Sequence, residues 1–197
     1  MSKKTGVLIV NLGTPDSPST SDVKKYLSEF LNDPRVIDIN PLGRKILVNG
    51  ILVPTRGPKS AKEYKKLFKI GNGASPLLTY GENLLKLVRE IGHQQFDVEL
   101  AMRYGNPSMD SVLEKMRLAN YDQIILFPLY PQYASATTGS IIEKAFKIIS
   151  RWWVIPEIKI IGQFYDDYRY LSCIKHIASS FNLDDYDHIL FSYHGVP

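Results

Sequence analysis

Short apolar runs of strand length alternate along the chain with amphipathic stretches of helix length, and this alternation limits the possible folds more than any other feature. The first run, residues 6–12, reads Gly-Val-Leu-Ile-Val-Asn-Leu and ends at a Gly-Thr-Pro turn. Uninterrupted apolar runs are typical of strands that are buried on both faces, because half-exposed strands alternate apolar with polar residues. Further strands are predicted at residues 96–103, 123–127, 158–162 and 188–192.

Between these runs, apolar residues recur at the three- and four-residue spacing of a helix. In the first such stretch the stripe runs from Val23 to Leu31, residues 19–21 offer N-caps, and Asp33-Pro34 ends the helix. Strands that alternate with helices predict βαβ units, and therefore an α/β fold with a parallel sheet covered by helices on both faces. Further helices are predicted at residues 59–69, 80–92, 138–150 and 167–180, and after the N-cap Ser108, where Val112, Leu113 and Met116 form the stripe.

Composition excludes several classes of protein. The chain has 197 residues, of which 44% are hydrophobic and 22% charged, as in globular proteins large enough to bury a core. Its single cysteine, Cys173, excludes an internal disulfide and any metal or iron–sulfur site built only from cysteines of this chain. No apolar run reaches the roughly 20 residues of a membrane span, and the N-terminal run is too short for a signal peptide. We therefore expect a cytoplasmic protein.

The positive charge is concentrated in the first half of the chain. Between Arg44 and Lys69 lie eight basic residues and one acidic residue, Glu63, although the net charge of the whole chain is only +4. Such a run is typical of a solvated helix face, but it would also attract an anionic ligand or an anionic membrane surface. Nucleic acid is not expected as a partner, because basic residues are not spread through the rest of the chain.

Four loops that follow predicted strands carry the polar and aromatic residues suited to ligand binding. They are residues 11–15, 103–107, 128–140 and 192–197. Ligands of open parallel sheets bind beyond the carboxyl ends of the strands, so these loops are expected to meet at one mouth. Tyr130 and Tyr133, followed by hydroxyl residues at a helix start, suit a flat aromatic ligand with anionic groups. Rings would stack on such a ligand, while hydroxyls and backbone N–H groups would bind its anions.

Each loop also has an ordinary structural interpretation. A Gly-Thr-Pro turn, tyrosines around a proline, and threonines that cap a helix all occur in proteins that bind nothing there. His194 alone is likewise more often a structural loop residue than a catalyst. The loop from Gly71 to Ser75 could hold a phosphate, but it lacks the Lys-Ser/Thr ending of a P-loop. A nucleotide- or sugar-binding α/β domain and a membrane-surface module therefore remain alternatives.

Taken together and in order, the loops resemble the ferrochelatase family. The resemblance extends from about residue 6 to the end of the chain and is carried by residues 10–15 (VNLGTP), 73–77 (GASPL), 102–107 (MRYGNP), 130–133 (YPQY), 137–140 (TTGS) and 192–197 (SYHGVP). It implies a Rossmann-like, chelatase-type fold and a lyase that inserts Fe²⁺ into protoporphyrin IX, the last step of haem synthesis. A related chelatase for another metal would share these features.

The resemblance also implies roles for individual residues. His194 corresponds to the active-site histidine, which either ligates the entering metal or accepts a pyrrole proton. A neutral imidazole, with an ordinary pKa of about 6.5, can do either. Arg103 and Ser75 correspond to residues that bind the porphyrin propionates, and about residues 41–76 correspond to a mobile lip of the pocket. The other expected porphyrin-binding residues are Leu12, Tyr64, Tyr104, Tyr130 and Thr138.

Two departures from the family pattern modify these expectations. Family members continue beyond the position of Pro197 with a second half of the fold, so we expect residues 1–197 to be an N-terminal portion without its C-terminal domain and with little activity alone. The spacing from Tyr64 to Ser75 is also longer than the family pattern.

Ser135 replaces the cysteine of members that hold an iron–sulfur cluster, so we expect no cluster and no permanently bound cofactor. Protoporphyrin IX and ferrous iron are the expected partners, with a transient membrane contact through the lip.

Overall fold

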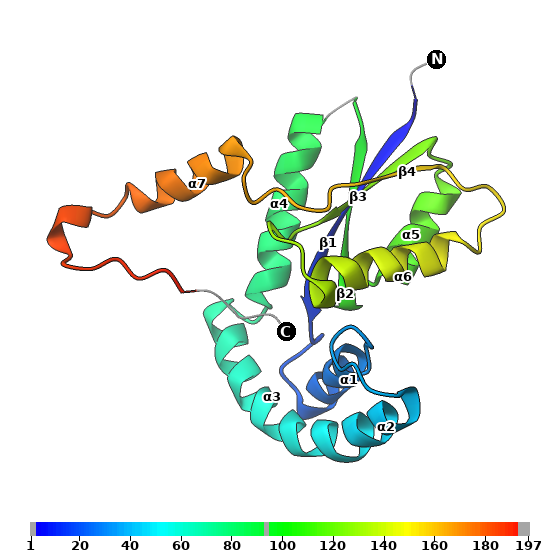
Figure 1. Ribbon diagram of the computed structural model, residues 1–197, viewed down its shortest axis with the longest axis horizontal. Coiled ribbons are helices and arrows are strands. Elements are labelled where there is room, and N and C mark those ends of the chain that lie inside the picture. The colour runs from blue at the N-terminus through cyan, green and yellow to red at the C-terminus, as the bar shows by residue number, and fades with distance from the viewer. Residues whose placement is uncertain (1–2, 93–94, 193–197) are drawn as a thin grey trace.

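The computed structural model describes residues 3–92 and 95–192, in which a parallel sheet is flanked by helices (Figure 1). The strands are β1 (Thr5–Thr14), β2 (Asp97–Gly105), β3 (Gln123–Pro128) and β4 (Glu157–Ile160). The α-helices are α1 (Thr20–Leu31), α2 (Pro41–Ile46), α3 (Val53–Ile70), α4 (Pro76–Gly92), α5 (Met109–Leu118), α6 (Ser140–Ile149) and α7 (Tyr168–Ala178). Two π-helical segments, Leu47–Leu52 and Ser135–Gly139, and a 3-10 turn, Leu183–Asp185, complete the described elements.

The sheet has the strand order β2-β1-β3-β4, and every neighbouring pair is parallel. The central strand β1 pairs Gly13 with Tyr104 of β2 and Val10 with Pro128 of β3. The predicted α/β class and parallel sheet are therefore confirmed. Because all strands run the same way, the ends of β1, β2 and β3 meet at one carboxyl edge.

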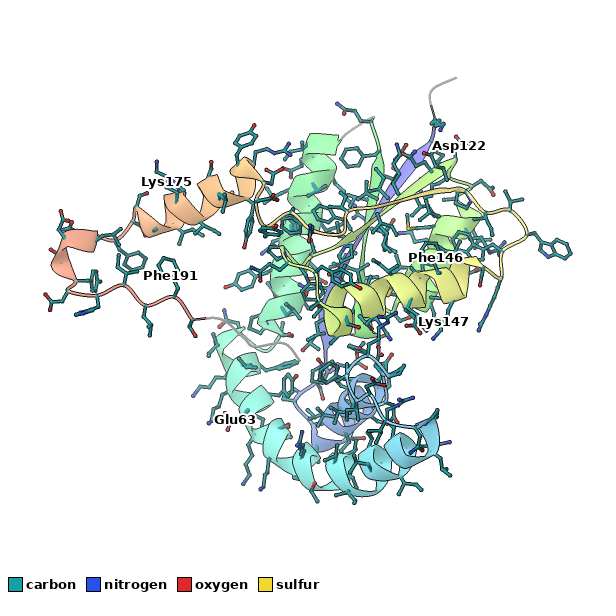
Figure 2. All side chains as sticks on the ribbon, in the orientation of Figure 1. Glu63, Asp122, Phe146, Lys147, Lys175 and Phe191 are labelled. Carbon is teal, nitrogen blue, oxygen red and sulfur yellow. The ribbon has the colours of Figure 1, made fainter. Side chains whose placement is uncertain are left out.

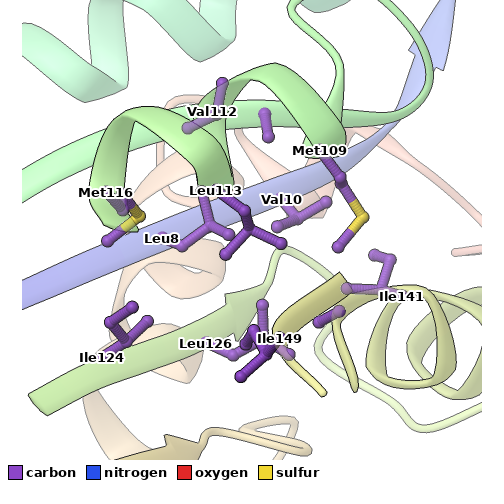
Figure 3. Packing of buried hydrophobic residues seen from close by; sticks show 12 residues of the cluster. Leu8, Val10, Met109, Val112, Leu113, Met116, Ile124, Leu126, Ile141 and Ile149 are labelled. Atoms are coloured by element: carbon purple, nitrogen blue, oxygen red, sulfur yellow. The ribbon is translucent and has the colours of Figure 1, made fainter. Parts of the chain in front are cut away.

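Apolar side chains cover both faces of this sheet. On one face Leu8, Val10 and Leu126 pack against helices α5 and α6, and each of these three side chains is at most 2% exposed (Figure 3). On the other face Ile9 and Leu100 pack beneath α4. The continuous apolar runs of the sequence reflect this burial on two sides.

Helices α1, α2 and α3 form a separate layer beyond the carboxyl edge, at the bottom of Figure 1. Helix α1 begins where the sequence predicted, because the side chain of Ser19 accepts a hydrogen bond from the backbone N–H of Asp22. Its Tyr26 ring meets the Tyr64 ring of α3 edge-on, with centroids 6.0 Å apart. A small apolar cluster around buried Val48 fixes the π-helical segment against α1.

Two predicted helices begin earlier than the sequence suggested. Helix α4, expected at residues 80–92, begins at Pro76, and α3 differs more. The stretch 59–69 was expected to start after Pro58, but α3 already begins at Val53 and Pro58 lies inside it. Pro58 removes one helical hydrogen bond, and this loss is tolerated because α2 and the π-helical segment have already started the helical path. Packing against α1 adds support, since Ala61 is only 2% exposed. About residues 41–70 of the expected lip are thus helical.

The prediction of a strand at residues 188–192 is wrong, because these residues form neither strand nor helix. A strand requires a neighbour to bond its backbone, and this stretch, which follows α7, pairs with none of the described strands and lies at a distance from the sheet. We call residues 168–192, which comprise α7 and this stretch, the C-terminal arm. Lys175 and Phe191 lie on the arm, at a distance from the sheet (Figure 2). No side chain of α7 is buried.

Candidate active site

The closest backbone approach at the carboxyl edge lies between β1 and β2. Gly13 has φ 113°, and a β-carbon added there would lie 1.8 Å from the carbonyl oxygen of Tyr104. Only glycine combines this backbone conformation with so close an approach. Gly13 and Thr14, expected in a turn, thus extend β1, and its end with Leu12 lies beside the end of β2 with Arg103 and Tyr104.

A buried carboxylate lies at the centre of this edge. Oδ2 of Asp33 accepts hydrogen bonds from the Tyr104 hydroxyl at 2.8 Å, from the Ser140 hydroxyl at 2.5 Å and from Nη2 of Arg103. Nε of Arg103 also donates to the Ser140 hydroxyl at 2.7 Å. The Asp33 side chain is 2% exposed and the Arg103 side chain 14% exposed. Three segments, namely the end of α1, the end of β2 and the start of α6, are thus joined through one oxygen atom.

The environment of Asp33 favours its charged form. Burial alone would raise its pKa, but the donors outweigh burial and hold the pKa below its ordinary value. These donors are the Ser140 hydroxyl, the backbone N–H of Arg35 and the Tyr104 hydroxyl, and the charge of Arg103 adds to them. The Arg103 guanidinium also stacks on the Tyr104 ring, 4.4 Å from its centroid. Asp33 and Arg103 therefore form a paired, largely dehydrated unit.

Four tyrosines gather beside this unit. Burial raises the pKa of Tyr26, and the phenols of Tyr64, Tyr130 and Tyr104 raise it further. Burial likewise raises the pKa of Tyr104 and of Tyr130. All these phenols are therefore neutral at physiological pH. They provide ring surface and O–H donors but no base.

Two buried side-chain oxygens in the same region have no hydrogen-bond partner among the described residues. They are the Tyr130 hydroxyl and the Thr138 hydroxyl, both in the segment that follows β3. A buried hydroxyl without a partner loses its hydration and gains nothing in return. A polar group of a bound molecule could supply the missing hydrogen bonds.

The structure thus brings together four of the eight residues predicted from the sequence. Arg103 and Tyr104 share the Asp33 network, and Tyr64 and Tyr130 are neighbours of Tyr26. Ser75 is buried just before α4, and its carbonyl accepts the Thr79 backbone N–H at 3.0 Å. No hydrogen bond or ring contact between described residues joins Ser75 or Leu12 to the Asp33 network. His194 lies outside the described residues.

Three residues of the site were not predicted from the sequence. Asp33 was interpreted only as part of a helix stop and Tyr26 only as part of a buried stripe. Ser140 belonged to the stretch 137–140 that carries the resemblance, but no role was assigned to it. Tyr26 could have been noticed, because a tyrosine buried within an apolar stripe needs a partner for its hydroxyl. Nothing in the local pattern marks Asp33, since its side-chain partners lie 70 to 107 residues further along the chain.

Comparison with known proteins assigns the family. The family model described as Ferrochelatase matches residues 4–197, which is nearly the whole chain. The chain belongs to the ferrochelatase family. It is 40% identical over 200 residues to a ferrochelatase of Chromobacterium violaceum, and the aligned region covers 98% of this chain and 54% of that protein. It is also 40% identical over 198 residues to a ferrochelatase of Francisella tularensis subsp. tularensis, covering 98% of this chain and 59% of the relative. The chain therefore spans about half the length of these relatives.

Three further observations concern clusters, metals and membranes. The Ser135 hydroxyl, where the resemblance led us to expect no cluster ligand, accepts a hydrogen bond from Nη1 of Arg35 at 3.0 Å. Within residues 3–92 and 95–192, no three His, Cys, Asp or Glu side chains are grouped so that they could hold a metal ion. Of the helices described, none has the length and apolar character needed to cross a membrane.

Proposed function

We propose that this chain supplies the porphyrin-binding portion of a ferrochelatase, the lyase that inserts Fe²⁺ into protoporphyrin IX to give protohaem. The observation that carries the proposal is the group of buried phenols and hydroxyls at the carboxyl edge, in which the hydroxyls of Tyr130 and Thr138 have no partner among described residues. A porphyrin is flat, aromatic and edged with carboxylates, so it suits ring surfaces combined with hydrogen-bond donors. Family membership supports the same substrate.

Arg103 and Ser75 are proposed to bind the propionates. Two of the three guanidinium nitrogens of Arg103 already donate to Asp33 and Ser140, whereas Nη1 donates to no described residue. Nη1 is therefore the atom that we assign to a propionate oxygen, through a charge-assisted hydrogen bond. Leu12, Tyr64, Tyr104, Tyr130 and Thr138 are proposed to line the pocket.

Metal insertion requires a base, because two N–H protons leave the macrocycle when Fe²⁺ enters. The phenols of the site are neutral and their raised pKa values make them poor proton acceptors. We assign proton acceptance, or ligation of the entering iron, to His194, because a neutral imidazole can do either. Iron is a substrate in this scheme, and no resident metal or cofactor is proposed.

The lip is proposed to touch a membrane surface transiently while a hydrophobic porphyrin is exchanged. Leu42, Ile46 and Ile51 are exposed on α2 and the π-helical segment, with Arg44 and Lys45 beside them. Apolar side chains next to basic ones favour contact with an anionic lipid surface. Mobility of about residues 41–76 stays a prediction.

The proposal can be tested with a chimaera in which the chain is joined to the residues that follow the matched region in the Chromobacterium violaceum relative. Titration with protoporphyrin IX is expected to shift the Soret band, and zinc or ferrous insertion is expected to follow by fluorescence or absorbance. His194→Ala should lower insertion by at least about 10²-fold while porphyrin affinity stays largely unchanged. An unshifted Soret band at saturating protein would contradict the proposed substrate.

His194→Ala also separates two parts of the proposal. Insertion within tenfold of the parent would remove His194 from the mechanism without affecting the binding assignment. Loss of porphyrin binding in this variant would instead place His194 among the binding residues. Tyr168→Phe offers a control away from this mouth, because Tyr168 is 74% exposed on α7 and is not among the residues assigned to the pocket.

A further inference from the structure

Two carboxylates join the segment that follows α1 to helix α6, and they differ in burial. Glu143 of α6 accepts a hydrogen bond from Nε of Arg35 at 2.5 Å, and the two side chains are 31% and 35% exposed. Asp33 accepts from Ser140 of α6, but its side chain is only 2% exposed. Asp33 therefore needs several donors to offset the loss of hydration, whereas Glu143 remains in contact with water.

The donors to Asp33 are residues of the proposed site. Its Oδ1 accepts the backbone N–H of Arg35 at 2.8 Å, which fixes the carboxylate plane within its own turn. Its Oδ2 then accepts from Arg103, Tyr104 and Ser140. Nε and Nη2 of Arg103 are both held in this way, so the guanidinium cannot turn without breaking hydrogen bonds to buried groups.

We propose that Asp33 is a positioning residue that holds Arg103 and Tyr104 in place and neutralises the charge of Arg103, so that Arg103 meets an anionic substrate chiefly through Nη1. This inference rests on the proposed function for its substrate and on the geometry for the Asp33 contacts. An unpaired arginine would bind any carboxylate through two nitrogens. In an arginine paired with Asp33, Nη1 is the one nitrogen without a described protein acceptor, and the pair carries little net charge, so the shape of the porphyrin contributes more to binding.

The restraint that the Asp33 carboxylate places on the Arg103 side chain can be tested without a porphyrin. Phenylglyoxal reacts with accessible arginines, and peptide mass mapping reports the rate of modification at each one. Asp33→Asn is expected to raise the rate at Arg103 at least about fivefold, because the amide keeps the shape of the carboxylate but loses its charge. Glu143→Gln, the matched control, should raise the rate at Arg35 and leave Arg103 unchanged. An unchanged rate at Arg103 in Asp33→Asn would overturn the proposal.

If Asp33→Asn does not fold, Ser140→Ala provides a second route. The Ser140 hydroxyl donates to Asp33 and accepts from Nε of Arg103, so its removal loosens the same unit while the Asp33 charge is kept. A smaller increase in Arg103 modification is expected, with the rate at Arg35 unchanged. Equal increases at Arg103 and Arg35 would indicate general loosening of the two segments and would overturn the assigned role.

A binding measurement tests the effect on substrate choice. Soret titrations of the chimaera with a porphyrin dicarboxylate and with its dimethyl ester give a ratio of affinities. Asp33→Asn should raise the affinity for the dicarboxylate, relative to that for the dimethyl ester, about fivefold, because Arg103 loses its counter-charge. In an Arg103→Ala background the same substitution should leave the ratio unchanged. A purely structural role would weaken both ligands equally, and that result would overturn the proposal.

The two proposals fail differently. A parent chimaera that binds neither porphyrin would contradict the proposed function, while Arg103 modification would still report the Asp33 contact. A parent that binds porphyrin and keeps the same ratio in Asp33→Asn would contradict the role of Asp33 alone.

Discussion

Two parts of the chain share one sequence pattern but differ in burial. Strand β3 and helix α6 combine an apolar run with an amphipathic helix, and their Leu126 and Ile141 are at most 2% exposed. The C-terminal arm also combines an amphipathic helix with an apolar run, yet its Ile177 is 66% exposed and its Leu190 91% exposed. Figure 1 shows the reason, since β3 and α6 lie among other elements whereas the arm extends away from them.

The difference shows what an apolar pattern specifies. The pattern specifies which face of an element lowers its free energy by burial. Burial requires a second surface and, for a strand, a neighbouring backbone that supplies hydrogen bonds. β3 has β1 on one side and β4 on the other, with α6 covering it. In the described residues the arm has no such cover, because none of the α7 side chains is buried. If this comparison is correct, equal substitutions in the two parts should have unequal effects.

The largest effect is expected where the sheet itself is closest packed. Gly13→Ala would place a methyl group 1.8 Å from the Tyr104 carbonyl oxygen, at φ 113°. The strands β1 and β2 would have to separate, so we expect a loss of about 4 kcal/mol or more, or failure to fold. Urea unfolding followed by circular dichroism measures this loss. Gly162→Ala, where an added β-carbon meets nothing within 4 Å, is the control. Near-parental stability of Gly13→Ala would mean that β1 and β2 are not in this register.

A matched pair of leucines compares the core of the sheet with the arm. Leu113 of α5 is fully buried, whereas Leu171 of α7 is 48% exposed. Leu113→Ala should lower the free energy of unfolding by about 2–5 kcal/mol, through lost burial and the cavity left behind. Leu171→Ala should lower it by less than about 1 kcal/mol. Equal losses in denaturant midpoint would show that the arm is packed as firmly as the core.

A smaller effect should appear on acidification and should depend on Asp33. Because the folded state holds the pKa of Asp33 below its ordinary value, the unfolded chain binds a proton first as the pH falls. The contribution of Asp33 is therefore complete above its ordinary pKa of about 3.9 and declines below it. Unfolding of the parent and of Asp33→Asn between pH 7 and pH 3 should give stability differences that shrink with acidification. A stability difference independent of pH would mean that the charge of Asp33 does not contribute to the free energy of unfolding.

The fold was largely predictable from the sequence, and the exceptions have physical causes. The four described strands and the N-caps Ser19 and Ser108 follow from local pattern and capping chemistry. The strand at 188–192 was predicted from the same apolar pattern and is wrong, because no described strand lies beside it. Local sequence predicts the preference of a segment, whereas the partner comes from the rest of the fold.

The site was predictable only where it follows the strand ends. Arg103 and Tyr104 were found because their motif resembles that of the family, and they lie near the end of β2, at the ligand edge of the sheet. Asp33 was not found, because an aspartate before proline at a helix end is an ordinary stop and its partners are distant in sequence. Whether Arg103 binds a propionate stays a prediction. The structure adds that this side chain is already paired with a buried carboxylate.

The smallest effect is expected from placing a charge on the arm. Ile177 is 66% exposed on α7, so Ile177→Lys replaces apolar surface in water by a solvated ammonium group. The change in the free energy of unfolding should stay within about 0.5 kcal/mol, because no burial is lost and lysine is a good helix former. The same substitution in α6, Ile141→Lys, would bury an unpaired charge at a fully buried position and should prevent folding. A loss of more than about 2 kcal/mol for Ile177→Lys would contradict the contrast between the two parts of the chain. It would mean that α7 packs against a surface of the molecule in solution.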